Sequence, residues 1–105
     1  MVTELTADEL QAKLDAGEDV QIVDTRSPAE YASGHIPGAE NLPYGELADR
    51  IAGIDWGEQV VLVCEIGQSS QQAARILESY EGVDDDAVIA SLKSGYEGWE
   101  YDLED

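Results

Sequence analysis

The most reactive side chain in this sequence belongs to its single cysteine, Cys64, which directly follows the run most typical of a strand. That run, residues 59–63, is nearly all apolar and rich in β-branched side chains. In an open parallel sheet, ligands bind beyond the carboxyl ends of the strands, where Cys64 would lie. Backbone N–H groups around the sulfur and the N-terminus of a following helix would lower the thiol pKa and stabilise a thiolate or a persulfide. The sequence therefore predicts a nucleophilic sulfur.

Two other interpretations of Cys64 stay open at this point. Free cysteine is among the most buried residue types and often serves as a small apolar filler, although a position before a glycine-bearing loop and a helix start favours reactivity. A redox role would need a partner to supply the resolving cysteine. A single cysteine cannot form an internal disulfide, which excludes the secreted, disulfide-stapled class.

Strand and helix patterns alternate along the chain. Two segments, Thr6–Glu9 and Ser27–Glu30, have the spacing of a capping box at a helix start. In the first half we expect a helix between Thr6 and Gly17, a strand at 20–23, a helix between Ser27 and Gly34, an extended piece at 40–42, and a helix through Leu47 and Ile51 that ends near Gly53. In the second half we expect the strand at 59–63, a loop at 65–70, a helix through 73–80, a strand at 87–90 and a final helix opened by a glycine turn at 93–99. This alternation predicts one α/β domain over residues 1–105, with a mainly parallel sheet of four to five strands and helices on both faces.

The charge of the chain is strongly negative. A formal net charge of −19 arises from 24 acidic and five basic side chains, which excludes nucleic acid and anionic membrane surfaces as natural partners. Because the Debye length shrinks to about 3 Å at 1 M salt, such a surface is typical of a halophile's cytoplasm, and we expect stability to rise with added KCl. No basic segment followed by an apolar stretch opens the chain, and no run of about 20 apolar residues occurs. We therefore expect a cytoplasmic protein, and a monomer because like charges repel.

Three consecutive aspartates occupy positions 84–86. Adjacent side chains in an extended loop do not point toward one centre, so we expect a solvated loop there and not a metal site. We expect neither a metal nor an organic cofactor anywhere in the chain.

Several motifs resemble the rhodanese homology family over nearly the whole length. The matching residues are 23–26, Glu30–Tyr31, 34–39, 41–43 and 95–99. Cys64 also falls where that family has its sulfur-carrying cysteine. The resemblance implies a rhodanese-like fold and a sulfurtransferase or sulfur carrier that moves sulfane sulfur through a persulfide on Cys64. Its donor would be thiosulfate, 3-mercaptopyruvate or a persulfide-bearing protein, and its acceptor a thiol or cyanide.

The resemblance gives structural roles to three residues outside the cysteine loop. Asp24 and Arg26 are similar to the family pair that ties a strand end to neighbouring backbone. His35 is similar to a hydrogen-bonding turn residue. A lone histidine in a turn of glycine and proline is more often structural than catalytic, and nothing nearby in the sequence completes a Cys–His pair.

The loop after the cysteine departs from the family pattern. The family often has arginine at the positions of Glu65 and Ser69, whereas Gly67 and Ser70 are retained. The residues expected to bind substrate or persulfide are Glu65, Ile66, Gly67, Gln68, Ser69 and Ser70. Losing two cations removes charge-assisted hydrogen bonds of about 1.5–3 kcal/mol each, and Glu65 adds a like charge beside an anionic substrate. We therefore predict weak activity with thiosulfate and favour a protein donor, which needs contact and not the capture of a dianion.

Two alternatives come from the same fold. In a catalytically inactive binding or regulatory module the altered loop would be expected, but a retained oxidisable thiol would serve no purpose. The phosphatase and arsenate-reductase branch needs an arginine that closes a longer loop, and no arginine occurs between Cys64 and Arg75. The sulfur-transfer interpretation is therefore preferred.

Overall fold

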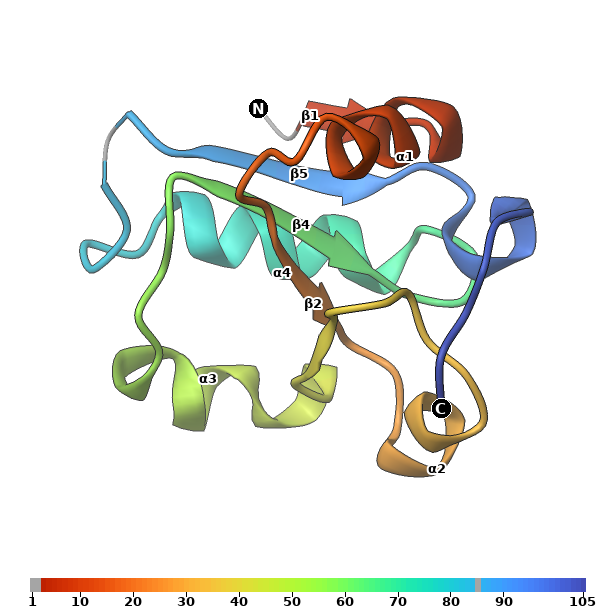
Figure 1. Ribbon diagram of the computed structural model, residues 1–105. Coiled ribbons are helices and arrows are strands. Elements are labelled where there is room, and N and C mark those ends of the chain that lie inside the picture. The colour runs from red at the N-terminus through yellow and green to blue at the C-terminus, as the bar shows by residue number, and fades with distance from the viewer. Residues whose placement is uncertain (1–2, 85) are drawn as a thin grey trace.

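A parallel sheet of five strands forms the centre of the fold (Figure 1), which we describe from a computed structural model for residues 3–84 and 86–105. The strands are β1 (Thr3–Leu5), β2 (Gln21–Asp24), β3 (Glu40–Asn41), β4 (Gln59–Val63) and β5 (Val88–Leu92). Their order across the sheet is β1-β5-β4-β2-β3, and every pairing is parallel. All five strands therefore end at the same edge, and the central strand β4 leads directly to Cys64.

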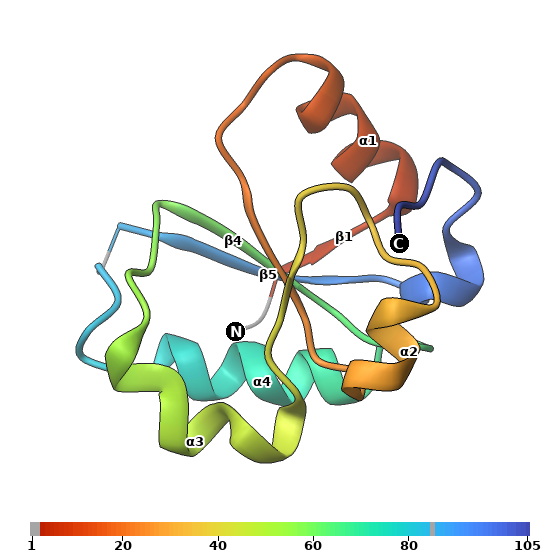
Figure 2. The same cartoon turned by 60° about the horizontal axis from the view of Figure 1, so that its bottom comes forward.

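Helices cover both faces of this sheet. They are α1 (Ala7–Asp15), α2 (Pro28–Ala32), α3 (Leu47–Arg50) and α4 (Ser69–Glu78), with short 3₁₀ segments η1 (Tyr44–Glu46), η2 (Ile51–Gly53) and η3 (Gly95–Gly98). Figure 2 shows α1 on one side of the sheet and α3 with α4 on the other. Side chains alternate along β4, so that Val60 and Leu62 pack in the α3/α4 core while Val61 and Val63 pack in the α1 core. Burial on both faces explains the nearly continuous apolar run of this strand.

The helix starts predicted from the sequence are present. Thr6 Oγ1 accepts from the Glu9 amide at 3.1 Å, and the Glu9 carboxylate accepts from the Thr6 amide at 2.9 Å. Ser27 and Glu30 form the same reciprocal pair at the start of α2. These capping boxes satisfy backbone donors that a helix leaves unpaired.

Five details differ from the sequence-based expectation. The edge strand β1 was not expected, because its three residues carry no apolar run. The sequence-based expectation ended β5 at Ala90 because Ser91 is polar. The strand in fact runs to Leu92, and Ser91 is fully buried within it. The helix expected near Leu47 is broken into η1, α3 and η2, and the final helix is only the 3₁₀ turn η3. The loop expected at 65–70 is shorter, since Ser69 and Ser70 already belong to α4.

The aspartates at 84–86 cannot be compared fully with the prediction, because Asp85 lies outside the described residues. Among residues 3–84 and 86–105, no group of three acidic, histidine or cysteine side chains is placed to hold a metal ion. The same residues contain no helix long and apolar enough to cross a membrane.

Candidate active site

Cys64 lies at the carboxyl end of β4 and is only 4% exposed. Neighbouring segments fix the backbone on either side of it. The amide and hydroxyl of Thr25, just beyond β2, donate to the Val63 carbonyl at 2.8 and 3.1 Å, and the Tyr96 amide donates to the Cys64 carbonyl at 3.0 Å. The sulfur is therefore held at a defined place where β2, β4 and the segment after β5 meet.

Uncharged groups surround the sulfur. The Gly67 amide donates to Cys64 Sγ at 3.0 Å, and the thiol donates to Ser70 Oγ at 3.3 Å. Burial raises the pKa of Cys64, but hydrogen bonding with the Ser70 and Ser69 side chains and with the Ser70 and Gly67 amides lowers it, and the net pKa is below the ordinary thiol value. The start of the ten-residue helix α4 lies at the same place, and its positive end also favours an anion. This arrangement favours a thiolate.

Two glycines allow the cysteine loop to approach the segment after β5. Gly67 has φ +87°, and a Cβ there would lie 3.0 Å from the Ser94 amide nitrogen. Gly95 has φ +52°, and a Cβ there would collide with the Cys64 carbonyl oxygen and lie 2.8 Å from the Glu65 carbonyl carbon. Only glycine fits both the left-handed backbone and the close approach.

A buried charged cluster follows the neighbouring strand β2. Arg26 donates to the Asp24 carboxylate through Nε at 3.1 Å and Nη2 at 2.8 Å, and Nη2 also donates to the Gly34 carbonyl at 2.7 Å. The guanidinium lies 3.7 Å from the ring centre of Tyr96, whose hydroxyl donates to Asp24 at 2.9 Å and accepts from the Ile36 amide. Burial, followed by the charge of Asp24, raises the pKa of the Tyr96 hydroxyl well above its usual range. This cluster connects the end of β2 to the turn that contains Gly34.

Glu65 extends from the cysteine loop toward this cluster. Its carboxylate lies 3.7 Å from Arg26 Nη1, and its side chain is 56% exposed. The side chain at one of the positions where the family often has arginine is therefore an anion paired with Arg26. Arg26, the cation that pairs with this loop residue, thus faces two carboxylates, Asp24 and Glu65.

His35 is held by other groups than the cysteine. Its Nδ1 lies 2.8 Å from the Tyr31 carbonyl, its ring stacks on Tyr31 at 3.7 Å, and its Nε2 lies 3.5 Å from the Glu104 carboxylate. The backbones of His35 and Glu104 also exchange two hydrogen bonds of 2.8 Å. Nδ1 thus fastens the turn to α2, while Nε2 and the backbone fasten it to the C-terminal segment.

Two residues near the sulfur were not singled out from the sequence. Tyr96 lies within the matched motif 95–99 but gave no sign of its contacts with Asp24 and Arg26, which are distant in the chain. Ser91 is fully buried with its Oγ 2.7 Å from Ser70 Oγ. A polar residue that interrupts the apolar pattern of a buried strand was the signal that could have revealed Ser91.

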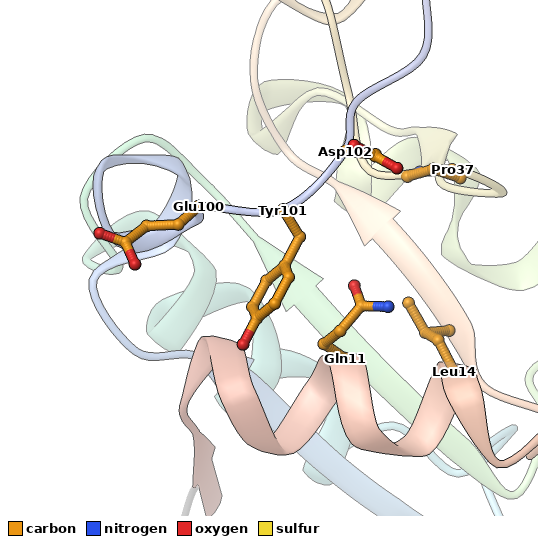
Figure 3. A pocket seen from close by; sticks show the side chains of 6 residues that line it. All are labelled: Gln11, Leu14, Pro37, Glu100, Tyr101 and Asp102. Carbon is orange, nitrogen blue, oxygen red and sulfur yellow. The ribbon is translucent and has the colours of Figure 1, made fainter.

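A separate hollow of about 400 Å³ lies between α1 and the C-terminal segment (Figure 3). It is lined by Gln11, Leu14, Pro37, Glu100, Tyr101 and Asp102. Tyr101 donates a hydrogen bond to Asp8 of α1 and so spans one side of this hollow. None of its lining residues belongs to the loop after Cys64.

Comparison with known proteins agrees with this fold. The family model for the rhodanese-like domain matches residues 6–102, and the chain therefore belongs to the rhodanese-like family. A solved rhodanese-like domain protein from Staphylococcus aureus superimposes with a TM-score of 0.81 at 34% identity, over 98% of this chain and 97% of that one. The predicted family and fold are thus confirmed.

Two curated relatives are similar in sequence. Thiosulfate sulfurtransferase GlpE of Pseudoalteromonas translucida is 37% identical over 83 residues, which cover 79% of this chain and 75% of GlpE. The putative sulfur carrier protein YrkF of Bacillus subtilis is 30% identical over 76 residues, which cover 72% of this chain. The chain spans only 41% of YrkF, which is a longer protein.

Proposed function

We propose that this chain is a rhodanese-type sulfurtransferase or sulfur carrier that moves sulfane sulfur through a persulfide on Cys64. The carrying observation is the position of Cys64 Sγ at the end of β4, where it accepts from the Gly67 amide at 3.0 Å and contacts the Ser70 hydroxyl. A relative named thiosulfate sulfurtransferase, similar over most of both chains, supports the same reaction class. The reaction needs a sulfur donor and a sulfur acceptor.

The proposed reaction has two steps that return the thiolate. In the first, the Cys64 thiolate attacks the outer sulfur of the donor, the bond between that sulfur and the donor breaks, and the donor leaves with the electron pair. In the second, an acceptor nucleophile, a thiolate or cyanide, attacks the outer sulfur of the persulfide, and Cys64 leaves as the thiolate. The Gly67 amide stabilises negative charge on Sγ before the first step and after the second.

Thiosulfate is proposed to be a poor donor for this site. The loop has no arginine, and the nearby Arg26 is paired with Asp24 and Glu65. A dianion approaching the sulfur would therefore meet the Glu65 carboxylate, and the loop offers it no arginine. A persulfide on another protein's cysteine carries less charge and is positioned by contact over a surface, so we propose a protein donor.

The test is a set of incubations of the purified chain in molar KCl with thiosulfate, with 3-mercaptopyruvate, and with a cysteine desulfurase plus cysteine, each followed by intact mass. We expect a gain of one sulfur atom that reductant reverses and that Cys64→Ser does not show. The desulfurase should give the most complete conversion. A Glu65→Arg/Ser69→Arg variant should turn over thiosulfate faster than the natural chain, and equal turnover would contradict the electrostatic argument.

A catalytically inactive binding or regulatory module is the second candidate. The Arg26–Glu65 pair favours it, because this pair engages a cation that contacts the cysteine loop. The same incubations separate the two functions. If no donor adds sulfur to a folded chain, a binding or regulatory module becomes the better explanation of its function.

A further inference from the structure

Two fully buried serines form a chain of hydrogen bonds with the sulfur. Ser70 belongs to the first turn of α4 and Ser91 to β5, and both are 0% exposed. Their Oγ atoms are 2.7 Å apart, and Ser70 Oγ is 3.3 Å from Cys64 Sγ. The neighbours of Ser91 along β5, Ala90 and Leu92, are apolar and equally buried. Burying a hydroxyl is unfavourable unless it is hydrogen-bonded, so Ser91 at this core position requires a reason.

The charge on the sulfur determines how the three groups can bond. A neutral thiol can donate to Ser70 Oγ, which leaves the Ser70 proton free to point toward Ser91. A thiolate has no proton and can only accept, so the Ser70 hydroxyl must turn toward the sulfur. Ser70 Oγ then needs a donor of its own, and the hydroxyl of Ser91 at 2.7 Å is placed to supply it. Ionisation of Cys64 thus reverses both hydrogen bonds.

We infer that Ser91 is a positioning residue, which acts through Ser70 by keeping the Ser70 hydroxyl directed at the sulfur and so favours the thiolate. The inference rests on the proposed function, because that function makes the thiolate the attacking form. Hydrogen bonds in a chain polarise one another, and those to an anion are the stronger ones. Loss of Ser91 should therefore weaken the bond from Ser70 to the thiolate more than the bond from the thiol to Ser70.

The groups that shift the pKa of the Cys64 thiol agree with this role. Burial raises the pKa of Cys64, and the Ser70 side chain is the strongest of the groups that lower it. Charged groups on the surrounding elements are unchanged in every variant proposed below. These groups are Asp24 and Arg26 of the β2 cluster, Glu65 of the loop, Arg75 and Glu78 of α4, and Lys93 and Glu97 after β5.

The test measures the rate at which iodoacetamide alkylates Cys64 as a function of pH, with the full chain in molar KCl. The matched variants are Ser91→Val and Ser91→Thr, which have nearly the same shape and differ in the hydroxyl. We expect the midpoint of the profile to rise by about half to one pH unit in Ser91→Val, the size of one neutral hydrogen bond. It should stay close to that of the natural chain in Ser91→Thr.

A double-mutant cycle shows whether Ser91 acts through Ser70. Ser70→Ala should raise the midpoint by at least as much as Ser91→Val, and adding Ser91→Val to Ser70→Ala should raise it no further. If neither β-branched variant folds, as judged by thermal melting, Ser91→Ala adds no atoms to the core and replaces Ser91→Val in the cycle.

Two outcomes would overturn the inference. One is an unchanged midpoint in Ser91→Val or Ser91→Ala together with a lower melting temperature, which would make Ser91 purely structural. The other is an equal shift in the Ser70→Ala background, which would mean that Ser91 acts independently of Ser70. Alkylation does not depend on a sulfur donor, so failure to form a persulfide would affect the proposed function and leave this result intact.

Discussion

β2 and β4 are neighbours in the sheet, yet the groups that follow them differ in chemistry. After β4, Cys64 is held by the uncharged amide of Gly67 and the hydroxyl of Ser70. After β2, a full ion pair between Asp24 and Arg26 is buried against the ring of Tyr96. Charged groups thus connect segments at the end of β2, whereas uncharged hydrogen-bonding groups hold the sulfur after β4.

This difference matters for a chain with a net charge of −19. Salt screens exposed charges strongly and buried pairs much less, and it has little effect on a neutral hydrogen bond. Both clusters should therefore function in a concentrated salt solution. Glu65 pairs with Arg26 but is 56% exposed, so its influence on Arg26 should depend more on salt than that of the buried Asp24.

The largest expected effect comes from breaking the charged cluster. Asp24 is fully buried and accepts from Arg26 and Tyr96. Asp24→Ala should cost about 3 kcal/mol of unfolding free energy, because Arg26 loses its buried partner and keeps only the exposed Glu65 carboxylate. Denaturant unfolding in KCl measures this, with the exposed Asp49→Ala as control, expected within about 0.5 kcal/mol of the natural chain. Equal losses in the two variants would show that the buried pair adds no more to the free energy of unfolding than an exposed carboxylate does.

A smaller loss should follow from separating the sulfur loop from the segment after β5. Gly95→Ala forces a Cβ onto the Cys64 carbonyl at φ +52°, and overpacking of this kind costs about 1–3 kcal/mol. Gly17→Ala is the matched control, since Gly17 has φ +74° but no atom lies within 4 Å of the place that its Cβ would take. Persulfide formation should fall in Gly95→Ala only. If both variants lose the same stability and activity, backbone strain and not the close approach is responsible.

Removing the carboxylate of Glu65 should have a moderate effect on substrate choice. Glu65→Gln leaves Arg26 without its second carboxylate, and the reaction with thiosulfate should accelerate about 2- to 5-fold, the size of an exposed ion pair. Glu97→Gln removes the same charge from a nearby position and should change the rate less. The accelerating effect should shrink as KCl is raised. Equal rates for the two variants at low salt would show that the acceleration comes from the change in net charge and not from the pairing of Glu65 with Arg26.

The smallest expected effect is a difference in the pKa of the Cys64 thiol between the folded and the unfolded chain. Since hydrogen bonding outweighs burial and lowers the pKa of Cys64 below that of an ordinary thiol, the alkylation rate should reach half its maximum at a lower pH than for an ordinary thiol. The same profile in guanidinium chloride should have its midpoint nearer the ordinary value. A lowered pKa in the folded chain means that this group stabilises the fold above its unfolded pKa, and that the contribution is lost as pH falls through the folded pKa. Coincident midpoints would contradict the arrangement around Sγ.

Features with a local cause were predictable from the sequence. The capping boxes at Thr6 and Ser27 depend on residues three positions apart, and the buried strand β4 depends on an apolar run. The position of Cys64 at the end of that strand follows from the same run. For these features, neighbours in sequence are also the interaction partners.

Features with a distant cause were not predictable. Ser91 meets Ser70 and Tyr96 meets Asp24 only because β5 and β2 both lie beside β4. The expectation for Glu65 considered an approaching anion and not Arg26, which the sheet brings within 3.7 Å. Such pairings require the strand order, and the residue pattern of one sequence does not determine it.

The contact between the cysteine loop and the segment after β5 also bears on how the protein is made. The carbonyls of Cys64 and Glu65 accept from the amides of Tyr96 and Glu97, and ribosomes add those residues well after the cysteine. Until they emerge, the backbone of the loop lacks these partners. The nascent chain therefore carries a thiol without its finished surroundings, and the reactive form develops only late in synthesis.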